Sequence, residues 1–134
     1  MFGATAAGGS VQCGGIGCGT VFEFSPNGSG WNFSGVYSFS GTDGEIPRGI
    51  LFDSSGNLFG AADGGNASCQ CCGCGVLFKL VPDSSNWTET VLHKFKGTTD
   101  GEFPNPVILD GAGHLFGTAV GGARNLGTIF EFTP

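Results

Sequence analysis

The sequence is poor in positive charge and has no long apolar run. Only five of its 134 residues are Lys or Arg, against eleven Asp or Glu, and the formal net charge is −6. Nucleic acids and anionic membranes are bound through basic patches, so this composition argues against both as partners. No apolar run reaches the roughly 18 residues of a membrane-spanning helix, and we expect no membrane insertion. The opening residues, MFGAT, also lack the charged and apolar regions of a signal peptide.

Helical periodicity is missing as well, whereas glycine is abundant. The 27 glycines and six prolines recur in register instead of being scattered. Phe2, Phe59 and Phe116 return every 57 residues (2 to 59 to 116), each followed by glycine. A fixed period of this size is typical of repeat architectures. We therefore interpret residues 1–134 as a single repeat array, with units at approximately 2–58 and 59–115 and a partial unit at 116–134.

Four segments of one period have the pattern of β-strands. Apolar and polar residues alternate in them, and Gly, Pro, Asn or Asp bound them: residues 49–53, 58–62, 75–80 and 88–95. The same alternation predicts that Trp31, Phe33, Tyr37 and Phe39 share one side of a strand. Aligning the copies predicts three, then four, then three strands along the chain. Phe22, Phe78 and Phe130 then occupy equivalent positions, and we expect each to be largely buried.

Four short antiparallel strands per period are typical of the blades of a β-propeller. The predicted fold class is thus all-β, a β-propeller-type arc of about three four-stranded antiparallel blades whose terminal blades are incomplete. A β-sandwich or another meander is the alternative. An open arc would expose apolar faces and unpaired strand edges. We expect these to be covered by further repeats of the same protein or by other copies in a homo-oligomer.

The six cysteines lie in two glycine-rich loops that align with each other. The third copy of the loop is five residues shorter and has no cysteine, which indicates that the cysteines staple the longer loop. This favours disulfides Cys13–Cys18 and Cys69–Cys74 and an oxidising compartment. Cys71 and Cys72 remain for a vicinal disulfide or an interchain bond. A thiolate metal site is the alternative, although the spacing of the second cluster does not match ordinary zinc or iron–sulfur motifs.

Two repeated Asp-Gly-Glu segments are the weak candidates for ligand binding. Asp43 and Glu45 recur as Asp100 and Glu102, in loops expected to share one rim with the cysteine loops. Repeated carboxylates there could hold a cation or a polyhydroxy ligand such as a glycan. The alternative is a solvated turn in which proline fixes the entry to the next strand. We predict no resident cofactor and no metal.

The other polar candidates align with structural positions. His93 stands where the first unit has Tyr37, which predicts a packing aromatic, and His114 stands at the position of Asn57. Asp53 and Asp110 precede tight turns, which favours Asx turns over a calcium site because one carboxylate per turn is too few. Four Asn-x-Ser/Thr triplets match the glycosylation signal. No catalytic constellation emerges from the sequence.

The combined pattern resembles the Gloeo/Verruco (GloVer) tandem repeat of bacterial secreted and surface proteins. The matching elements are Asn57-Leu58-Phe59-Gly60, Gly64-Gly65, residues 17–22, Trp31, and Asp43-Gly44-Glu45 followed by Pro47, and the resemblance covers essentially the whole chain. The chain departs from the repeat at His114, which replaces the turn asparagine, and in the shortened loop of the third copy. The resemblance implies a propeller-like extracellular module, often in multi-repeat proteins with a separate anchor, and it implies no catalytic residues.

Three hypotheses follow for the function. The first is a non-catalytic extracellular module for surface display, adhesion or assembly, located outside the cell or on the surface of a bacterium. The second is a propeller that binds a glycan on the rim of cysteine loops and Asp-Gly-Glu loops. The third is a fragment of a propeller enzyme whose active site lies in other blades. A repeated pocket of aromatic and carboxylate groups would favour the second, and a single unrepeated His or Arg in a central channel would favour the third.

Overall fold

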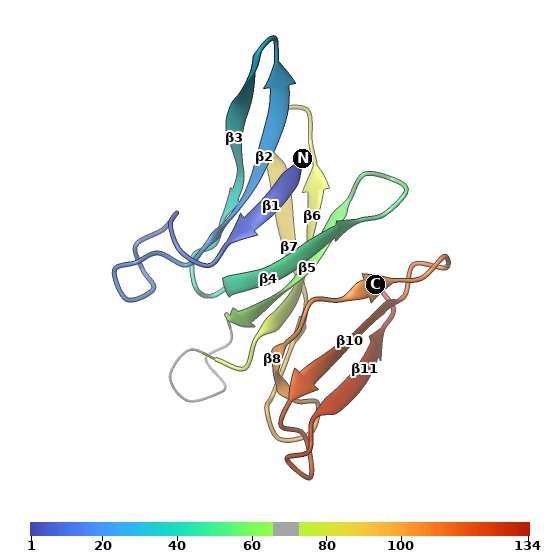
Figure 1. Ribbon diagram of the computed structural model, residues 1–134. Helices are drawn as coiled ribbons and strands as arrows, with labels where there is room; N and C mark the ends of the chain where they lie inside the picture. Colours follow the sequence, from blue (N-terminus) through green and yellow to red (C-terminus); the bar gives the residue numbers. More distant parts are fainter. Residues whose placement is uncertain (66–72) are drawn as a thin grey trace.

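The chain is built of short β-strands. The computed structural model describes residues 1–65 and 73–134, and these residues contain no helix (Figure 1). The strands are β1 (Phe2–Thr5), β2 (Thr20–Asn27), β3 (Gly30–Ser38), β4 (Glu45–Phe52), β5 (Leu58–Gly64), β6 (Val76–Pro82), β7 (Trp87–Lys94), β8 (Glu102–Pro104), β9 (Ile108–Leu109), β10 (Leu115–Val120) and β11 (Thr128–Phe132).

These strands form three antiparallel sheets that are not closed into a barrel. Sheet I has the order β1-β2-β3, sheet II the order β4-β5-β6-β7, and sheet III the order β11-β10-β8, with β9 also paired to β10. Figure 1 shows sheet II between the other two. The prediction of an all-β fold with antiparallel sheets is confirmed. The grouping of strands also follows the predicted three, four and three, because β8 and β9 together take the place of β4.

In sheet III the counterpart of β4 is divided into two strands, β8 and β9, and this division has a local cause in the sequence. Gly49 pairs with Ala61 within β4, whereas the equivalent position in the next copy is Pro106. Proline has no backbone N–H to donate to a strand ladder. The pairing with β10 therefore stops after Pro104 and resumes at Ile108.

The strand that was predicted over residues 49–53 begins earlier than expected, at Glu45. The sequence placed the Asp-Gly-Glu segments wholly in loops, but Glu45 pairs with Gly64 and Glu102 with Val120. The turn is already complete at Gly44, whose φ of 152° is in the range that favours glycine, so pairing starts at the next residue. The other three strands of sheet II shift by at most two residues at either end.

The recurring Phe-Gly pair has a packing reason. Gly60 lies directly opposite Phe78 across the β5–β6 ladder, as Gly3 lies opposite Phe22 and Gly117 opposite Phe130. A Cβ atom on Gly3 or Gly117 would come within 2.5 Å of the ring of the opposing phenylalanine. The ring therefore lies over the glycine backbone, and only glycine leaves room for it. This contact repeats in all three sheets and explains the 57-residue motif.

A β-bulge in β3 corrects the predicted placement of its aromatic residues. Val21 pairs with Tyr37 but Phe22 pairs with Gly35, so β3 carries one extra residue. An extra residue reverses which face the following side chains occupy. Trp31 and Phe33 are 63% and 64% exposed, whereas Phe39 is fully buried on the other face. The prediction that all four aromatics share one side is wrong, and β7 has the same bulge at the equivalent place.

The sheets pack through two apolar clusters built from the same repeat positions. We call the face of sheets II and III that is turned toward the preceding sheet the front face, and the opposite one the back face. In sheet I the faces are named by the equivalent repeat positions. The back face of sheet I meets the front face of sheet II, and sheet II meets sheet III in the same way. Equivalent members of the two clusters are Cys18 and Cys74, Val21 and Leu77, Phe39 and Phe95, Leu58 and Leu115, and Ala62 and Ala119.

Backbone contacts between neighbouring sheets repeat in the same way. The amide of Ile46 donates to the carbonyl oxygen of Cys18 at 2.9 Å, and that of Phe103 to the carbonyl oxygen of Cys74 at 2.8 Å. Next to these bonds, Gly19 packs against Pro47, and Gly75 packs against Pro104. Both glycines have a left-handed φ, near 100°, which also favours glycine there. The relation of sheet I to sheet II is thus repeated between sheets II and III.

Candidate functional site

A disulfide closes the loop between β1 and β2. Cys13 and Cys18 are bonded, with their Cα atoms 5.0 Å apart, as the sequence predicts. The loop is also tied by its backbone, because Gly8 donates to Ile16 and Cys18 to Ser10. Cys74 is disulfide-bonded too. Its predicted partner Cys69, and the predicted pairing of Cys71 and Cys72, lie outside the described residues.

The β3–β4 loop lies directly beside this disulfide, as expected for a shared rim. A Cβ on Gly41 would come within 2.9 Å of the Cys13 Sγ. In the same loop, Asp43 accepts hydrogen bonds from the amide and hydroxyl of Ser40, at 2.8 and 2.9 Å. The Tyr37 hydroxyl donates to the other carboxylate oxygen at 2.6 Å. Burial and the Asp43 carboxylate raise the pKa of Tyr37, so the phenol stays protonated.

Asp100 holds its own loop in the same way. The amide of Lys96 donates to one carboxylate oxygen at 2.9 Å, and Nε2 of His93 lies 2.9 Å from the other. Burial acts to raise the pKa of Asp100, but the Lys96 amide and the His93 side chain outweigh it and hold that pKa below its usual range. His93 also packs edge-on against Phe95, so it is the packing aromatic that was predicted. Its bond to Asp100 was not predicted, although the Tyr37–His93 alignment contained the signal.

The four candidate carboxylates do not gather into one site. Asp43 and Asp100 bond to their own loops, while Glu45 and Glu102 begin strands β4 and β8 in different sheets. Within residues 1–65 and 73–134 no group of three or more His, Cys, Asp or Glu side chains is placed to hold a metal ion. Each Asp-Gly-Glu segment thus uses its aspartate to shape a turn.

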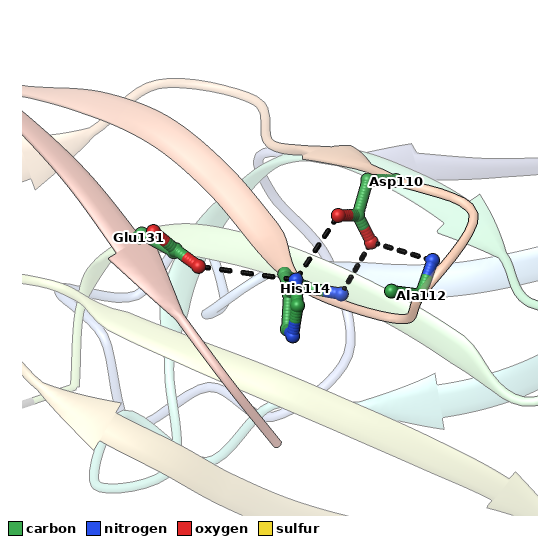
Figure 2. Close-up of polar contacts among 4 residues, drawn as sticks. All are labelled: Asp110, Ala112, His114 and Glu131. Atoms are coloured by element: carbon green, nitrogen blue, oxygen red, sulfur yellow. Dashed lines mark hydrogen bonds and ion pairs between the residues drawn. The ribbon is translucent and has the colours of Figure 1, made fainter.

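The turns at the other ends of the strands are Asx turns, as predicted. Asp53 accepts from the amides of Ser55 and Asn57, and Asp110 accepts from those of Ala112 and His114, as Figure 2 shows for the second pair. The His114 amide is the main cause that holds the pKa of Asp110 below its usual range. Nδ1 of His114 lies 3.0 Å from the same carboxyl and 3.8 Å from Glu131 (Figure 2). His114 thus takes over the role that the Asn57 side chain has toward Asp53.

Glu89 is a polar group that sequence reasoning missed. It lies opposite Leu80 on the front face of sheet II, and its Oε1 is buried with no hydrogen-bond partner among the described residues. Burial is the main cause that raises the pKa of Glu89 to about 7, and the nearby Asp43 carboxylate adds to it. The signal was present, because alternation along β7 places Glu89 on the same face as Trp87. An acidic residue at an inward position of a strand is uncommon and costly.

Arg48 and Asp63 form a second unpredicted pair, across the β4–β5 ladder. The Arg48 guanidinium donates twice to Oδ2 of Asp63, once from Nε at 2.7 Å and once from Nη2. Asp63 is the buried partner, with 8% exposure, whereas the Arg48 side chain is 53% exposed. The hydrogen bond to Asp63 raises the pKa of Arg48, which is charged in any case. The pair compensates the burial of one carboxylate in sheet II.

Three antiparallel sheets joined through equivalent contacts define the class of this protein, an all-β repeat protein. The chain belongs to the Gloeobacter/Verrucomicrobia repeat family, whose sequence model matches residues 1–134. Neither the curated proteins nor the solved structures contain a match to the chain. In the part of the chain that the structure describes, no helix is long and apolar enough to cross a membrane.

Proposed function

We propose that this chain is a non-catalytic extracellular repeat module of β-propeller type, which serves surface display, adhesion or assembly. Each sheet acts as one blade, and the repeated interface between sheets is the unit of construction. Repeat proteins gain stability from such nearest-neighbour interfaces, so an array grows by adding equivalent units. The proposed partners are further repeats, in the same polypeptide or in other copies.

The observation that carries this proposal is the open back face of sheet III. Val21 and Leu77 occupy equivalent positions on the back faces of sheets I and II and are 0% and 1% exposed. The third equivalent, Ile129, is 85% exposed, and Leu126, which is equivalent to the fully buried Cys18 and Cys74, is also 85% exposed. Large apolar side chains gathered on one face mark an interaction surface. The face has the composition of an interface, and no sheet of the described residues covers it.

The front face of sheet I is the other half of the interface, and aromatic residues on it are also exposed. Trp31 and Phe33 are exposed, and the Phe33 ring packs only against Phe22 and Phe24 of its own sheet among the described aromatic contacts. Their counterparts in sheet II, Trp87 and Glu89, lie on the front face that meets sheet I. The chain therefore presents both halves of the interface that it uses internally twice.

The disulfide supports the extracellular part of the proposal. Disulfides such as Cys13–Cys18 persist in oxidising compartments and are rare in the cytosol. After export into a bacterial periplasm, intact-mass analysis without reductant should find the chain lighter by two hydrogen masses for each bridge. A peptide linking Cys13 to Cys18 should be recovered. Free thiols at both positions in exported protein would contradict an extracellular role.

An in-phase extension of the chain tests the array itself. Pro134 aligns with Pro82, so a second copy of residues 83–134 appended after Pro134 continues the repeat without a break. The added sheet should cover Ile129 and raise the free energy of unfolding, as additional repeats do. The matched control is an extension of equal length in which the same residues are shuffled.

The substitution Ile129→Glu makes this test specific to the proposed face. In the chain of 134 residues it should change the free energy of unfolding little, because Ile129 is exposed. In the extended chain it should remove most of the gain in stability, because a charge would then be buried without a partner. An extension that adds no stability, or one whose gain is indifferent to Ile129→Glu, would overturn the repeat-array proposal.

A further inference from the structure

A cavity of about 150 Å³ lies between sheets II and III. Sheet II and the loop that follows it contribute Leu77, His93 and Asp100 to its walls, and β11 contributes Phe130 and Phe132. Within the described residues β11 pairs only with β10, so the other edge of β11 is open. An open strand edge offers unpaired N–H and C=O groups to another strand. The cavity and this edge therefore share one strand.

The equivalent place between sheets I and II is filled by a fourth strand. There β7 pairs with β6, and Val91 lies opposite Phe78 while Glu89 lies opposite Leu80. Val91 packs against the apolar cluster between the two sheets, and the charge of Glu89 acts on Tyr37. Because Phe130 and Phe132 are equivalent to Phe78 and Leu80, the cavity corresponds to the space that Val91 and Glu89 occupy in the other interface.

We propose that the open edge of β11 and this cavity form a binding site for an extended peptide strand. The bound strand pairs antiparallel with β11. It places a branched aliphatic side chain opposite Phe130 and a neutral side chain opposite Phe132. Main-chain hydrogen bonds give such strand addition its affinity, and alternate side chains in pockets give it specificity. The inference rests on the proposed repeat array, because the occupant is inferred from the strand that completes sheet II.

The charges around the cavity determine which side chain fits opposite Phe132. Asp100 and Glu131 both line it, and His93 already bonds to Asp100. An incoming carboxylate would therefore face like charge, as Glu89 faces Asp43 in the existing interface. A glutamine keeps the shape and the hydrogen-bonding capacity without the charge. We accordingly expect the site to prefer a neutral residue at this position.

The probe is a synthetic peptide with the sequence of residues 86–96, labelled at its N-terminus. In the register of β7, its Val91 falls opposite Phe130 and its residue 89 opposite Phe132. Fluorescence anisotropy against the whole chain should show saturable binding, and the peptide with Glu89→Gln should bind about threefold to tenfold more tightly, since like charges at close range repel. A scrambled peptide, and a peptide with Val91→Asp, should lose at least about tenfold in affinity, or 1.4 kcal/mol.

Two variants of β11 locate the peptide on the protein. Phe132→Asp alters the cavity wall and should weaken binding at least about tenfold. Ile129→Asp changes a residue of the same strand that does not itself line the cavity, and it should leave the affinity within about twofold. Hydrogen exchange at the β11 amides should slow when the peptide is bound. Because Val91→Asp alters only the peptide, that comparison stands even where a protein variant folds poorly.

The results separate this site from the repeat array. No binding at millimolar peptide, or binding that Ile129→Asp abolishes and Phe132→Asp leaves intact, overturns the strand site. If the in-phase extension still stabilises the chain in that case, the array proposal survives without the strand site. Peptide binding in the stated register supports the strand site whatever the extension does.

Discussion

Sheets II and III carry the same pattern of residues but lie in different surroundings. Sheet II is covered on both faces, and its β5 is buried along its whole length. Among the described residues sheet III is covered only on its front face, and in the equivalent β10 only Leu115 and Ala119 are buried. Leu77 and Ile129 differ from 1% to 85% in exposure although they hold the same place in the repeat. Burial in this protein is decided by the neighbouring sheet and not by the residue.

The largest expected difference between sheets II and III is in the stability contributed by Phe78 and Phe130, the phenylalanines that lie over the paired glycines. Phe78 is fully buried between sheets, whereas Phe130 is only partly buried. Phe78→Ala should cost about 3–5 kcal/mol in the free energy of unfolding, in the range for buried aromatics, and Phe130→Ala clearly less. Chemical denaturation of both variants measures the two costs. Equal losses would show that the third sheet is covered as fully as the second.

A second comparison concerns the stability contributed by Leu77 and Ile129, the equivalent back-face residues of sheets II and III. Leu77→Ala should cost at least about 2 kcal/mol because it leaves a cavity between sheets II and III. Ile129→Ala should stay within about 0.5 kcal/mol, as exposed positions usually do. The unfolding curves should be recorded at low protein concentration, where contacts between molecules contribute least. A large cost at Ile129 under those conditions would mean that its side chain is covered in solution.

The next largest expected difference is the stability that a disulfide gives to the β1–β2 loop, compared with the shorter loop of sheet III that has no cysteine. Replacing Cys13 and Cys18 together by serine removes a constraint on the unfolded chain, and for so short a loop the loss should be about 2 kcal/mol. The loop at 123–126 has no cysteine and should not respond to reductant. Hydrogen exchange with and without reductant separates the two loops. Equal responses of both loops would count against the staple.

The smallest effect is a pH dependence of the interface between sheets I and II. The pKa of Glu89 is raised from 4.5 to about 7 in the folded chain, so folding favours the protonated carboxyl. Its contribution is fully present below pH 4.5 and is lost as the pH rises through 7. Glu89 is only half-buried, so solvent screening leaves a change of the order of 1 kcal/mol.

Glu89→Gln tests this dependence directly. The variant should be more stable than the natural chain above pH 7 and should flatten the fall in stability between pH 4.5 and 7. Denaturation midpoints across that range provide the measurement. An unchanged slope in the variant would show that Glu89 is not the source of the pH dependence.

Much of this protein was determined by its sequence alone. The 57-residue period, the strand alternation and the turn residues predicted the all-β class, the grouping of the strands into antiparallel sheets, the Asx turns and the Cys13–Cys18 bond. These features are local, because alternation, turn chemistry and short loop closure depend on residues close together in the chain. Comparison of the copies added the roles of His93 and His114.

Only the tertiary structure decided the features that depend on a neighbouring sheet. The bulge in β3 moved Trp31 and Phe33 to the face opposite Phe39, which alternation could not reveal because one extra residue reverses all later side chains. The raised pKa of Glu89 depends mainly on its burial and also on the carboxylate of Asp43, which is distant in sequence. The exposure of Ile129 depends on what packs against sheet III, and no property of the residue itself contains that information.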